Sequence, residues 1–266
     1  MAVNDTQKEV VFKPITNLTF HFQCHKGIAC FTHCCAALNL VLTPYDIIRL
    51  KQHLKISSDE FLDRYTETKY TKSHRFPLIY LKMNQDEGAK CPFVTSDGCN
   101  VYPDRPGACR IYPLGRAASN APIRTGRQEK FFIVEEEHCL GFQETREWSV
   151  EEWLANQGVN EYNAMNDLWS EILTSTKDLG PAKDIQKKMQ MFSMASYNLD
   201  RFREFIFESR FFQLFQVEEE KREVLASEDV ELMKFAFEWL KYSLFGEKTI
   251  ELREKTLDSE DPRRRV

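Results

Sequence analysis

The residues of this chain best suited to chemistry are its eight cysteines. Seven of them lie in two short stretches: the first has the spacing C-x5-C-x3-C-C and the second C-x7-C-x9-C. Thiolates gathered in this way are the ligands that zinc, copper(I) and iron-sulfur clusters prefer. The pattern therefore predicts a metal site, with these candidate ligands: Cys24, Cys30, Cys34, Cys35, Cys91, Cys99, Cys109 and Cys139.

Composition favours metal over disulfides as the reason for this clustering. The first twenty residues contain charges and no apolar run of signal-peptide length, so we expect a cytoplasmic protein. Clustered cysteines in a reducing compartment more often bind metal than form disulfides. No apolar stretch approaches the length of a membrane span. A net charge of -5 argues against a nucleic-acid partner, because phosphate neutralisation needs a basic face.

The adjacent cysteines Cys34 and Cys35 restrict how eight thiols can be used. Two side chains on either side of one trans peptide tend to diverge, and closing both onto one zinc would need a strained small ring. We therefore expect them to serve different metals, or different irons of one cluster. Two four-thiolate sites, one cluster with one mononuclear site, and one site with spare cysteines all stay open.

The isolated Cys139 and three histidines complete the set of possible ligands. Cys139 follows an expected strand that could return it to the site, although a buried apolar role is the alternative. His25, His33 and His138 lie within or beside the cysteine groups. With eight thiols present, we expect these histidines behind the ligands or on the surface.

Basic residues accompany the second cysteine stretch. Several thiolates around a dication leave negative charge, which Lys90, Arg105 and Arg110 could offset, Arg110 above all. The segment 115–126 has small residues without periodicity, as is typical of a functional loop or flap.

Helices and strands must position these side chains. Thr43 and Pro44 predict the start of a helix, and Ser57 or Ser58 predicts a second one. The segment 76–83 reads as a strand, with segment 130–137 as its partner. The second cysteine stretch lies in the loop between them.

Beyond residue 142 the pattern is helical throughout. Ser149 and Glu152 match a capping box for a helix that ends near Gly158, and Asn160 is the expected cap of the next helix. Later helices carry broad apolar faces. We expect these faces to form the core of a bundle, with a docking groove for a partner helix or apolar substrate as the alternative. The expected faces comprise Phe202, Phe205, Ile206, Phe212, Leu232, Phe235, Ala236, Trp239 and Leu240.

The predicted fold is α+β and dominated by helices. An irregular, metal-organised N-terminal half with a small antiparallel β element packs on a C-terminal helical set. We expect a cysteine-cluster domain at 1–142 and a helical extension or domain at 143–266.

The cysteine pattern also resembles a known family. The first stretch with its T-P-x-D continuation at Thr43, followed by C-P-F and R-P-x-x-C-R-x-Y-P up to Pro113, is similar to the YkgJ-like cysteine-cluster proteins of bacterial type. That resemblance covers roughly residues 20–142 and implies zinc or iron chelation. The spacing from Cys24 to Cys34 resembles the cysteine region of the flagellin lysine methylase FliB, which implies an iron-sulfur cluster and S-adenosylmethionine chemistry.

Three hypotheses follow from the sequence. The first, which we prefer, is a metal-binding protein with an iron-sulfur cluster or zinc in a structural, redox or metal-handling role. The second is an enzyme of the FliB type that uses S-adenosylmethionine to modify a protein or small substrate. The third is a zinc-folded module whose C-terminal helices bind a protein partner. The sequence contains no nucleotide-binding, nucleophile-elbow or zinc-protease motif that would name a reaction.

Overall fold

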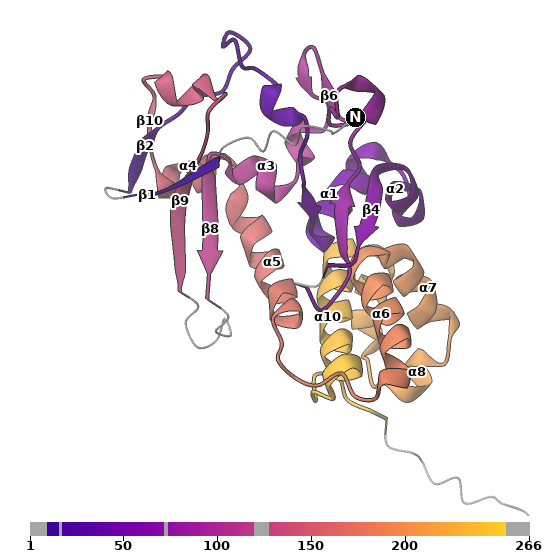
Figure 1. Cartoon of the computed structure of the whole chain (residues 1–266). Coiled ribbons are helices and arrows are strands. Elements are labelled where there is room, and N and C mark those ends of the chain that lie inside the picture. Colours follow the sequence, from indigo (N-terminus) through magenta and orange to yellow (C-terminus); the bar gives the residue numbers. More distant parts are fainter. Residues whose placement is uncertain (1–9, 16–17, 72–73, 120–127, 254–266) are drawn as a thin grey trace, which may run out of the picture.

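The computed structural model describes residues 10–15, 18–71, 74–119 and 128–253. Short strands and loops make up most of the N-terminal part, and helices make up the C-terminal part (Figure 1). The predicted α+β fold with dominant helices is thereby confirmed. Among the described residues, no helix is both long and apolar enough to cross a membrane.

Four small antiparallel sheets are present in the described part of the chain. The largest has the order β1-β9-β8, and a second has the order β3-β5-β4. The remaining two are the pair β10-β2 and the hairpin β6-β7. The strand bounds are β1 Val10–Pro14, β2 Thr19–His21, β3 Val41–Leu42, β4 Thr66–Lys69, β5 Leu78–Leu81, β6 Val94–Thr95, β7 Gly98–Cys99, β8 Leu114–Ala118, β9 Glu129–Glu136 and β10 Glu147–Ser149.

Both predicted strands exist, but their predicted pairing with each other is wrong. Strand β5 pairs with β3 on one edge and β4 on the other, while β9 pairs with β1 and β8. Both edges of each strand are therefore filled by other partners. The two strands belong to separate sheets.

The expected loop at 115–126 is partly a strand. Its first residues belong to β8, which pairs with β9 from Leu114↔Ile133 to Ala118↔Glu129. Gly115 is needed there because a side chain would collide with the ring of Phe132, whose nearest atom lies 2.2 Å from an added Cβ. Residues 120–126 lie outside the described residues, so the prediction of a flap stays untested.

Local capping signals place the first two helices as predicted. Helix α1, Pro44–Leu54, begins after Thr43 with a full capping box to Asp46. Helix α2, Ser58–Tyr65, begins after Ser57, whose hydroxyl accepts from Glu60 N–H. Such caps satisfy backbone donors that a helix start leaves without partners. Helix α2 packs against both α1 and β4 (Figure 1).

Helices after residue 149 follow the predicted pattern, with one wrong cap. Helix α4, Val150–Asn156, has the expected box between Ser149 and Glu152 and ends just before Gly158. Helix α5, Val159–Leu173, is capped by Gly158, so Asn160 lies inside the helix and does not cap it. The left-handed backbone of Gly158, at φ 63°, makes the sharp turn between the two helices.

The remaining helices form the C-terminal set. Their aromatic faces point inward, which agrees with the predicted bundle core: Phe202, Ile206, Leu232 and Ala236 are fully buried. The bounds are α6 Ala182–Tyr197, α7 Leu199–Glu208, α8 Phe211–Leu214, α9 Glu219–Ser227 and α10 Asp229–Phe245. The short α3 covers Gly107–Ile111, and single 3-10 turns are η1 His33–Cys35, η2 Gln85–Glu87, η3 Tyr102–Asp104 and η5 Leu140–Gln143.

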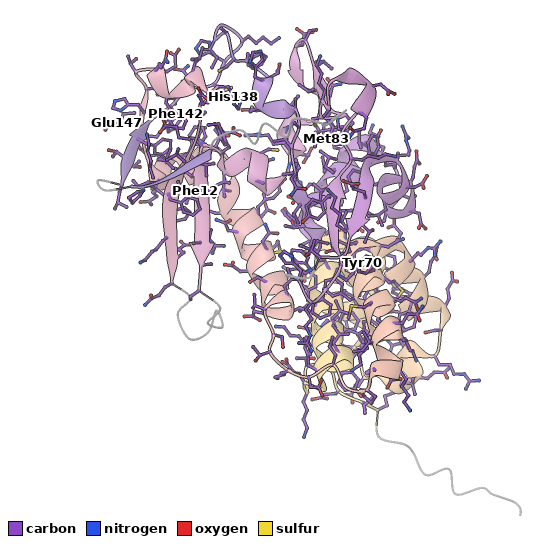
Figure 2. The ribbon with its side chains drawn as sticks, in the orientation of Figure 1. Phe12, Tyr70, Met83, His138, Phe142 and Glu147 are labelled. Carbon is purple, nitrogen blue, oxygen red and sulfur yellow. The ribbon has the colours of Figure 1, made fainter. Side chains whose placement is uncertain are left out.

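Two separate hydrophobic cores result. The helical core contains the C-terminal helices together with α1, α2 and β5. The smaller aromatic core contains residues of β2, β10, α4 and the start of β8, with Phe22, Trp148 and Trp153 at its centre. In Figure 2, Phe142 and His138 lie on the side of the aromatic core, and Met83 and Tyr70 lie on the side of the helical core.

Candidate metal centre

All eight cysteines lie in the upper part of the molecule, on loops and short elements around the boundary between the two cores (Figure 1). The loop after β2 carries Cys24 and Cys30, and η1 carries Cys34 and Cys35. The β6-β7 hairpin has Cys91 just before it and Cys99 on its second strand. Helix α3 supplies Cys109, and the turn after β9 supplies Cys139. No disulfide joins any two of the eight.

The structure brings four of these thiols together as one group. Partial burial, followed by electrostatic interaction with Cys34, Cys139 and Cys30, raises the pKa of Cys24 to about 11. The pKa of Cys139 is also raised, by burial and then by its neighbours Cys30 and Cys34. We call Cys24, Cys30, Cys34 and Cys139 the first thiol group.

The other four thiols interact in the same way. Desolvation by the surrounding protein, followed by electrostatic interaction with Cys91, Asp46, Cys99 and Cys34, raises the pKa of Cys109. Burial also raises the pKa of Cys91 to about 11, with Cys99 adding to the effect. We call Cys35, Cys91, Cys99 and Cys109 the second thiol group.

The two groups meet at the vicinal pair. The Sγ atoms of Cys34 and Cys35 are 4.0 Å apart. The pKa of Cys35 is raised first by its hydrogen bond with Cys34, then by burial, and further by Cys109 and Cys91. Non-glycine residues with left-handed backbone surround the pair, at Thr32, Ala37 and Ala89. Such conformations are costly and persist only where the surrounding structure enforces them.

Backbone N–H groups are directed at several of the sulfur atoms. Leu140 N–H donates to Cys30 Sγ at 3.2 Å. Hydrogen bonds from Phe93 and Val94 act to lower the pKa of Cys91, and one from Val101 acts to lower that of Cys99. Donors of this kind stabilise the thiolate over the thiol. Thiolate is also the form that binds metal.

Eight thiols are the type and number of donors that soft metal ions or clusters need. The thiols do not, however, already surround a common point. Among the described residues, which include all eight cysteines, no three His, Cys, Asp or Glu side chains converge as a ready metal site. The raised pKa values mean that these thiols keep their protons while no metal is bound. Binding a metal would therefore draw the thiols inward and remove their protons.

Helix α1 holds the second thiol group in place, which the sequence did not reveal. Asp46 is buried and accepts from Thr43 N–H at 2.8 Å and, with its other oxygen, from Gly107 N–H at 2.8 Å. Burial, the largest effect, raises the pKa of Asp46 in spite of these donors. Gly107 opens the helix α3 that carries Cys109. One carboxylate thus links the starts of α1 and α3.

A second link joins α1 to the turn before α3. Arg49 donates to Asp104 Oδ1 at 2.9 and 2.5 Å, and His53 Nδ1 lies 2.8 Å from Asp104 Oδ2. In the sequence, His53 does not lie near any candidate metal ligand. In the structure, it helps to hold Asp104 in place. Together with Asp46, these contacts fix the R-P-x-x-C-R segment against α1.

The three residues predicted to compensate thiolate charge have different contacts in the structure. Arg105 is buried and interacts electrostatically with Cys99 and Cys109, as expected of a residue that offsets thiolate charge. Arg110 instead donates to the carbonyl oxygens of Pro103, Arg105 and Gln157, so its guanidinium is committed to backbone. Lys90 lies in the bridge Ala36↔Lys90 next to the vicinal pair.

Two of the three histidines have other partners among the described residues. His25 Nδ1 accepts from Gly27 N–H at 3.1 Å, and its Nε2 lies 3.4 Å from Glu144. His138 Nε2 lies 3.8 Å from Glu136. His33 lies in η1, directly before the vicinal pair. Metal ligation by any of them stays untested.

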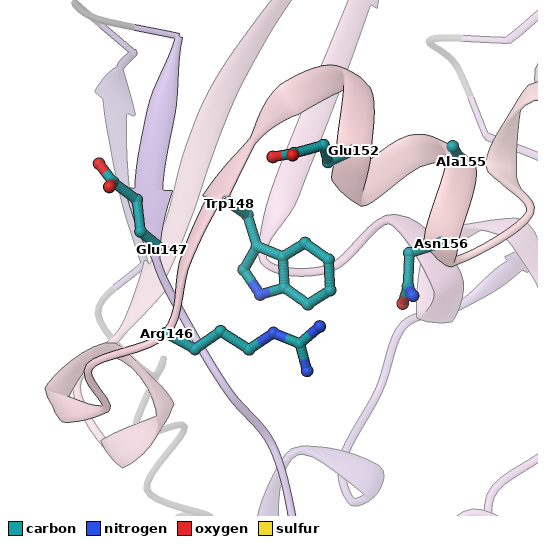
Figure 3. A pocket seen from close by; sticks show the side chains of 6 residues that line it. All are labelled: Arg146, Glu147, Trp148, Glu152, Ala155 and Asn156. Carbon is teal, nitrogen blue, oxygen red and sulfur yellow. The ribbon is translucent and has the colours of Figure 1, made fainter.

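A shallow hollow on the surface has no cysteine in its lining. Figure 3 shows it beside Trp148, with Arg146 below the indole ring and Glu152 above. The Arg146 guanidinium lies 3.9 Å from the ring centroid, so a cation-π contact occupies part of the hollow. None of the residues that line it is a cysteine: Arg146, Glu147, Trp148, Glu152, Ala155 and Asn156.

The site and the comparisons point to one class of domain. Residues 23–140 match the family model CxxCxxCC, described as "Putative zinc- or iron-chelating domain". All eight cysteines fall within the matched segment. This segment of the chain is similar to that family, and the predicted resemblance to metal-chelating cysteine-cluster proteins is confirmed. Comparisons with curated proteins and with solved structures each found no match.

Proposed function

We propose that this chain is a metal-binding protein that holds iron, as an iron-sulfur cluster, or zinc through its clustered thiolates. The observation that carries the proposal is the assembly of eight thiols from five separate segments at one boundary between cores. Sulfur-only donor sets select zinc or iron-sulfur clusters over hard cations. The match of residues 23–140 to the "Putative zinc- or iron-chelating domain" supports the same metals.

The role we propose for the metal is structural first. Cys91 and Cys99 pack against the helical core, while Cys139 packs against the aromatic core. A metal held between them would restrain both cores. Free thiols at such a site also require a reducing compartment, and we propose the cytoplasm.

The test is elemental analysis and absorption spectroscopy of protein purified without oxygen. Iron with inorganic sulfide and a broad visible band would establish an iron-sulfur cluster. Colourless protein that retains zinc would establish the zinc alternative and would exclude the enzyme of the FliB type. Iron-loaded protein should then be assayed for turnover of S-adenosylmethionine, because only such turnover would favour that enzyme. Protein without either metal would contradict the proposal.

The matched variants are Cys109→Ser and Ser227→Ala. Loss of the Cys109 thiol should reduce the metal content, because it removes one sulfur donor near the centre of the second group. Ser227 lies on α9 in the C-terminal helical set, so its variant should keep the full content. Equal metal content in the two variants would exclude Cys109 as a ligand.

A further inference from the structure

We infer that the eight thiols form two separate four-thiolate centres that meet at the Cys34–Cys35 peptide. The first thiol group would hold one centre and the second thiol group the other. This inference rests on the proposed metal-binding function and specifies its stoichiometry. Its geometric support comes from backbone contacts within each group.

Backbone contacts tie the first group to the turn after β9. Leu140 N–H, next to Cys139, donates to Cys30 Sγ at 3.2 Å. Gln23 N–H, next to Cys24, donates to Gly141 O at 3.1 Å. Three of the four thiols therefore lie on two segments that are hydrogen-bonded to each other. Cys34 follows His33, whose N–H donates to Cys30 O at 2.9 Å, so the same loop carries Cys34 next to Cys30.

Different contacts tie the second group to the hairpin and α3. Cys91 N–H donates to Cys35 O at 2.8 Å, which aligns these two residues side by side. Cys99 pairs with Val94 in the β6-β7 hairpin, which begins three residues after Cys91. Cys109 is brought to the hairpin by α3, whose first residue is held by Asp46.

The count of donors also favours two centres. A tetrahedral zinc and the common iron-sulfur clusters each take four protein ligands. Cys139 of the first group packs against the aromatic core, and Cys91 and Cys99 of the second group pack against the helical core. Because Cys34 and Cys35 are neighbours in the chain, each centre contains one member of the vicinal pair. If metal bound at both centres, the peptide between Cys34 and Cys35 would connect the two centres, and through them the two cores.

The experiment uses the full chain loaded anaerobically with zinc alone as the probe metal. Elemental analysis should find about two zinc ions per chain in the unsubstituted protein and about one in both Cys34→Ser and Cys35→Ser. Alkylation of accessible thiols followed by peptide mass spectrometry then identifies the surviving centre. In Cys34→Ser the labelled thiols should be Cys24, Cys30 and Cys139; in Cys35→Ser they should be Cys91, Cys99 and Cys109.

The results of this experiment can contradict the two-centre inference without contradicting the proposed metal binding. Loss of all zinc in both folded variants, or the same labelled thiols in both, would indicate a single joint centre and overturn the division while metal binding stands. Absence of metal from the unsubstituted protein, with either zinc or iron, overturns both. Graded chelation of the unsubstituted protein provides a check that needs no variant. Two sets of four thiols should become labelled in two steps, and one step exposing all eight contradicts the inference.

Discussion

At the scale of single residues, Tyr112 lies next to the thiols, although the sequence contains no pattern that selects it. Among the described residues, its buried hydroxyl has no partner that meets the geometric criteria for a hydrogen bond. The hydroxyl nevertheless lies close enough to Cys139 to favour a lower pKa of that thiol. Burial, then Cys139 itself, raises the pKa of Tyr112. The hydroxyl therefore stays protonated and can donate to a thiolate at Cys139.

We expect Tyr112→Phe to weaken metal retention at the first thiol group about tenfold, since groups that orient a ligand contribute about that much to affinity. Competition with a chromogenic chelator measures this. Tyr70→Phe is the control, because Tyr70 is 77% exposed and its variant should bind as the unsubstituted protein does. Equal affinities for the two variants would remove Tyr112 from the site.

A second prediction at this scale concerns Asp46. Asp46→Asn replaces one of two acceptor oxygens by a donor, so either Thr43 N–H or Gly107 N–H loses its partner. We expect a loss of about 1–3 kcal/mol in the free energy of unfolding, as for a buried donor left unpaired. Asp63→Asn, on the exposed face of α2, should change stability by no more than about 0.5 kcal/mol.

The alkylation rates of two cysteines distinguish a positioning role for Asp46 from general destabilisation. If Asp46 positions α3, alkylation of folded Asp46→Asn should label Cys109 faster while Cys24 keeps its rate. Unchanged labelling at Cys109 would show that Asp46 acts only as a helix cap.

At the scale of elements, the loop that carries Cys24 depends on the ring of Phe22. That side chain is 2% exposed, and it packs edge-on against Tyr112, Phe142 and Trp153. Trp148 Nε1 donates to Phe22 O at 2.9 Å, which fixes the backbone at the same point. The entry to the first thiol group is therefore anchored in the aromatic core.

We expect Phe22→Ala to lower the free energy of unfolding by about 3–5 kcal/mol, the usual cost of truncating a buried aromatic ring. Chemical denaturation measures it. Phe12→Ala is the matched control, because Phe12 is 66% exposed on β1 and its loss should cost far less. A similar cost for both variants would mean that the aromatic core does not anchor this loop.

At the scale of the whole molecule, one ion network joins α1 to the C-terminal helices. Lys51, 6% exposed, lies 2.8 Å from Asp200 and 3.1 Å from Asp229, and Arg203 contacts both carboxylates. Burial acts to raise the pKa of each carboxyl, but hydrogen bonds from Lys51 to Asp200 and from Arg203 to Asp229 hold both below their ordinary values.

These shifts predict sensitivity to acid. Because the folded pKa values of Asp200 and Asp229 are depressed, the unfolded chain binds more protons as the pH falls below about 4. Their contribution is complete above the unfolded pKa and is lost as the pH falls through the folded values. Lys51→Met should therefore unfold at a higher pH and lose roughly 1–3 kcal/mol at neutral pH.

Lys234→Met provides the comparison for this prediction. Lys234 forms an exposed ion pair with Glu231 on α10, which should contribute at most about 1 kcal/mol. Acid titration followed by circular dichroism measures both variants. Coincident acid transitions would mean that the Lys51 network does not couple α1 to the bundle.

Local signals in the sequence were sufficient for the helices but not for the sheets. The caps at Thr43 and Ser149 were predicted because a cap depends on residues three positions apart. Strand pairing failed because β3 and β8 are short and carry no strong alternation, so nothing local showed that they would fill the edges of β5 and β9. Asn160 was misassigned as a cap because Gly158 makes the turn by backbone conformation and not by its side chain.

The candidate ligands followed from cysteine spacing, but their arrangement could not. Which thiols are neighbours depends on long-range contacts, such as Leu140 N–H to Cys30 and Cys91 N–H to Cys35. The roles of Asp46 and Arg110 likewise depend on partners that are 47 to 61 positions away. Only the fold supplies those partners.

The commitment of Arg110 to Gln157 has a practical consequence for anyone who wishes to isolate the smallest metal-binding fragment. A polypeptide cut at residue 142 would leave this buried guanidinium without one of its carbonyl acceptors and without the ring of Tyr162, which lies 4.7 Å from it. The shortest fragment that keeps both contacts extends through α5 to Leu173. We expect a fragment of residues 1–173 to express in folded form more readily than one of residues 1–142.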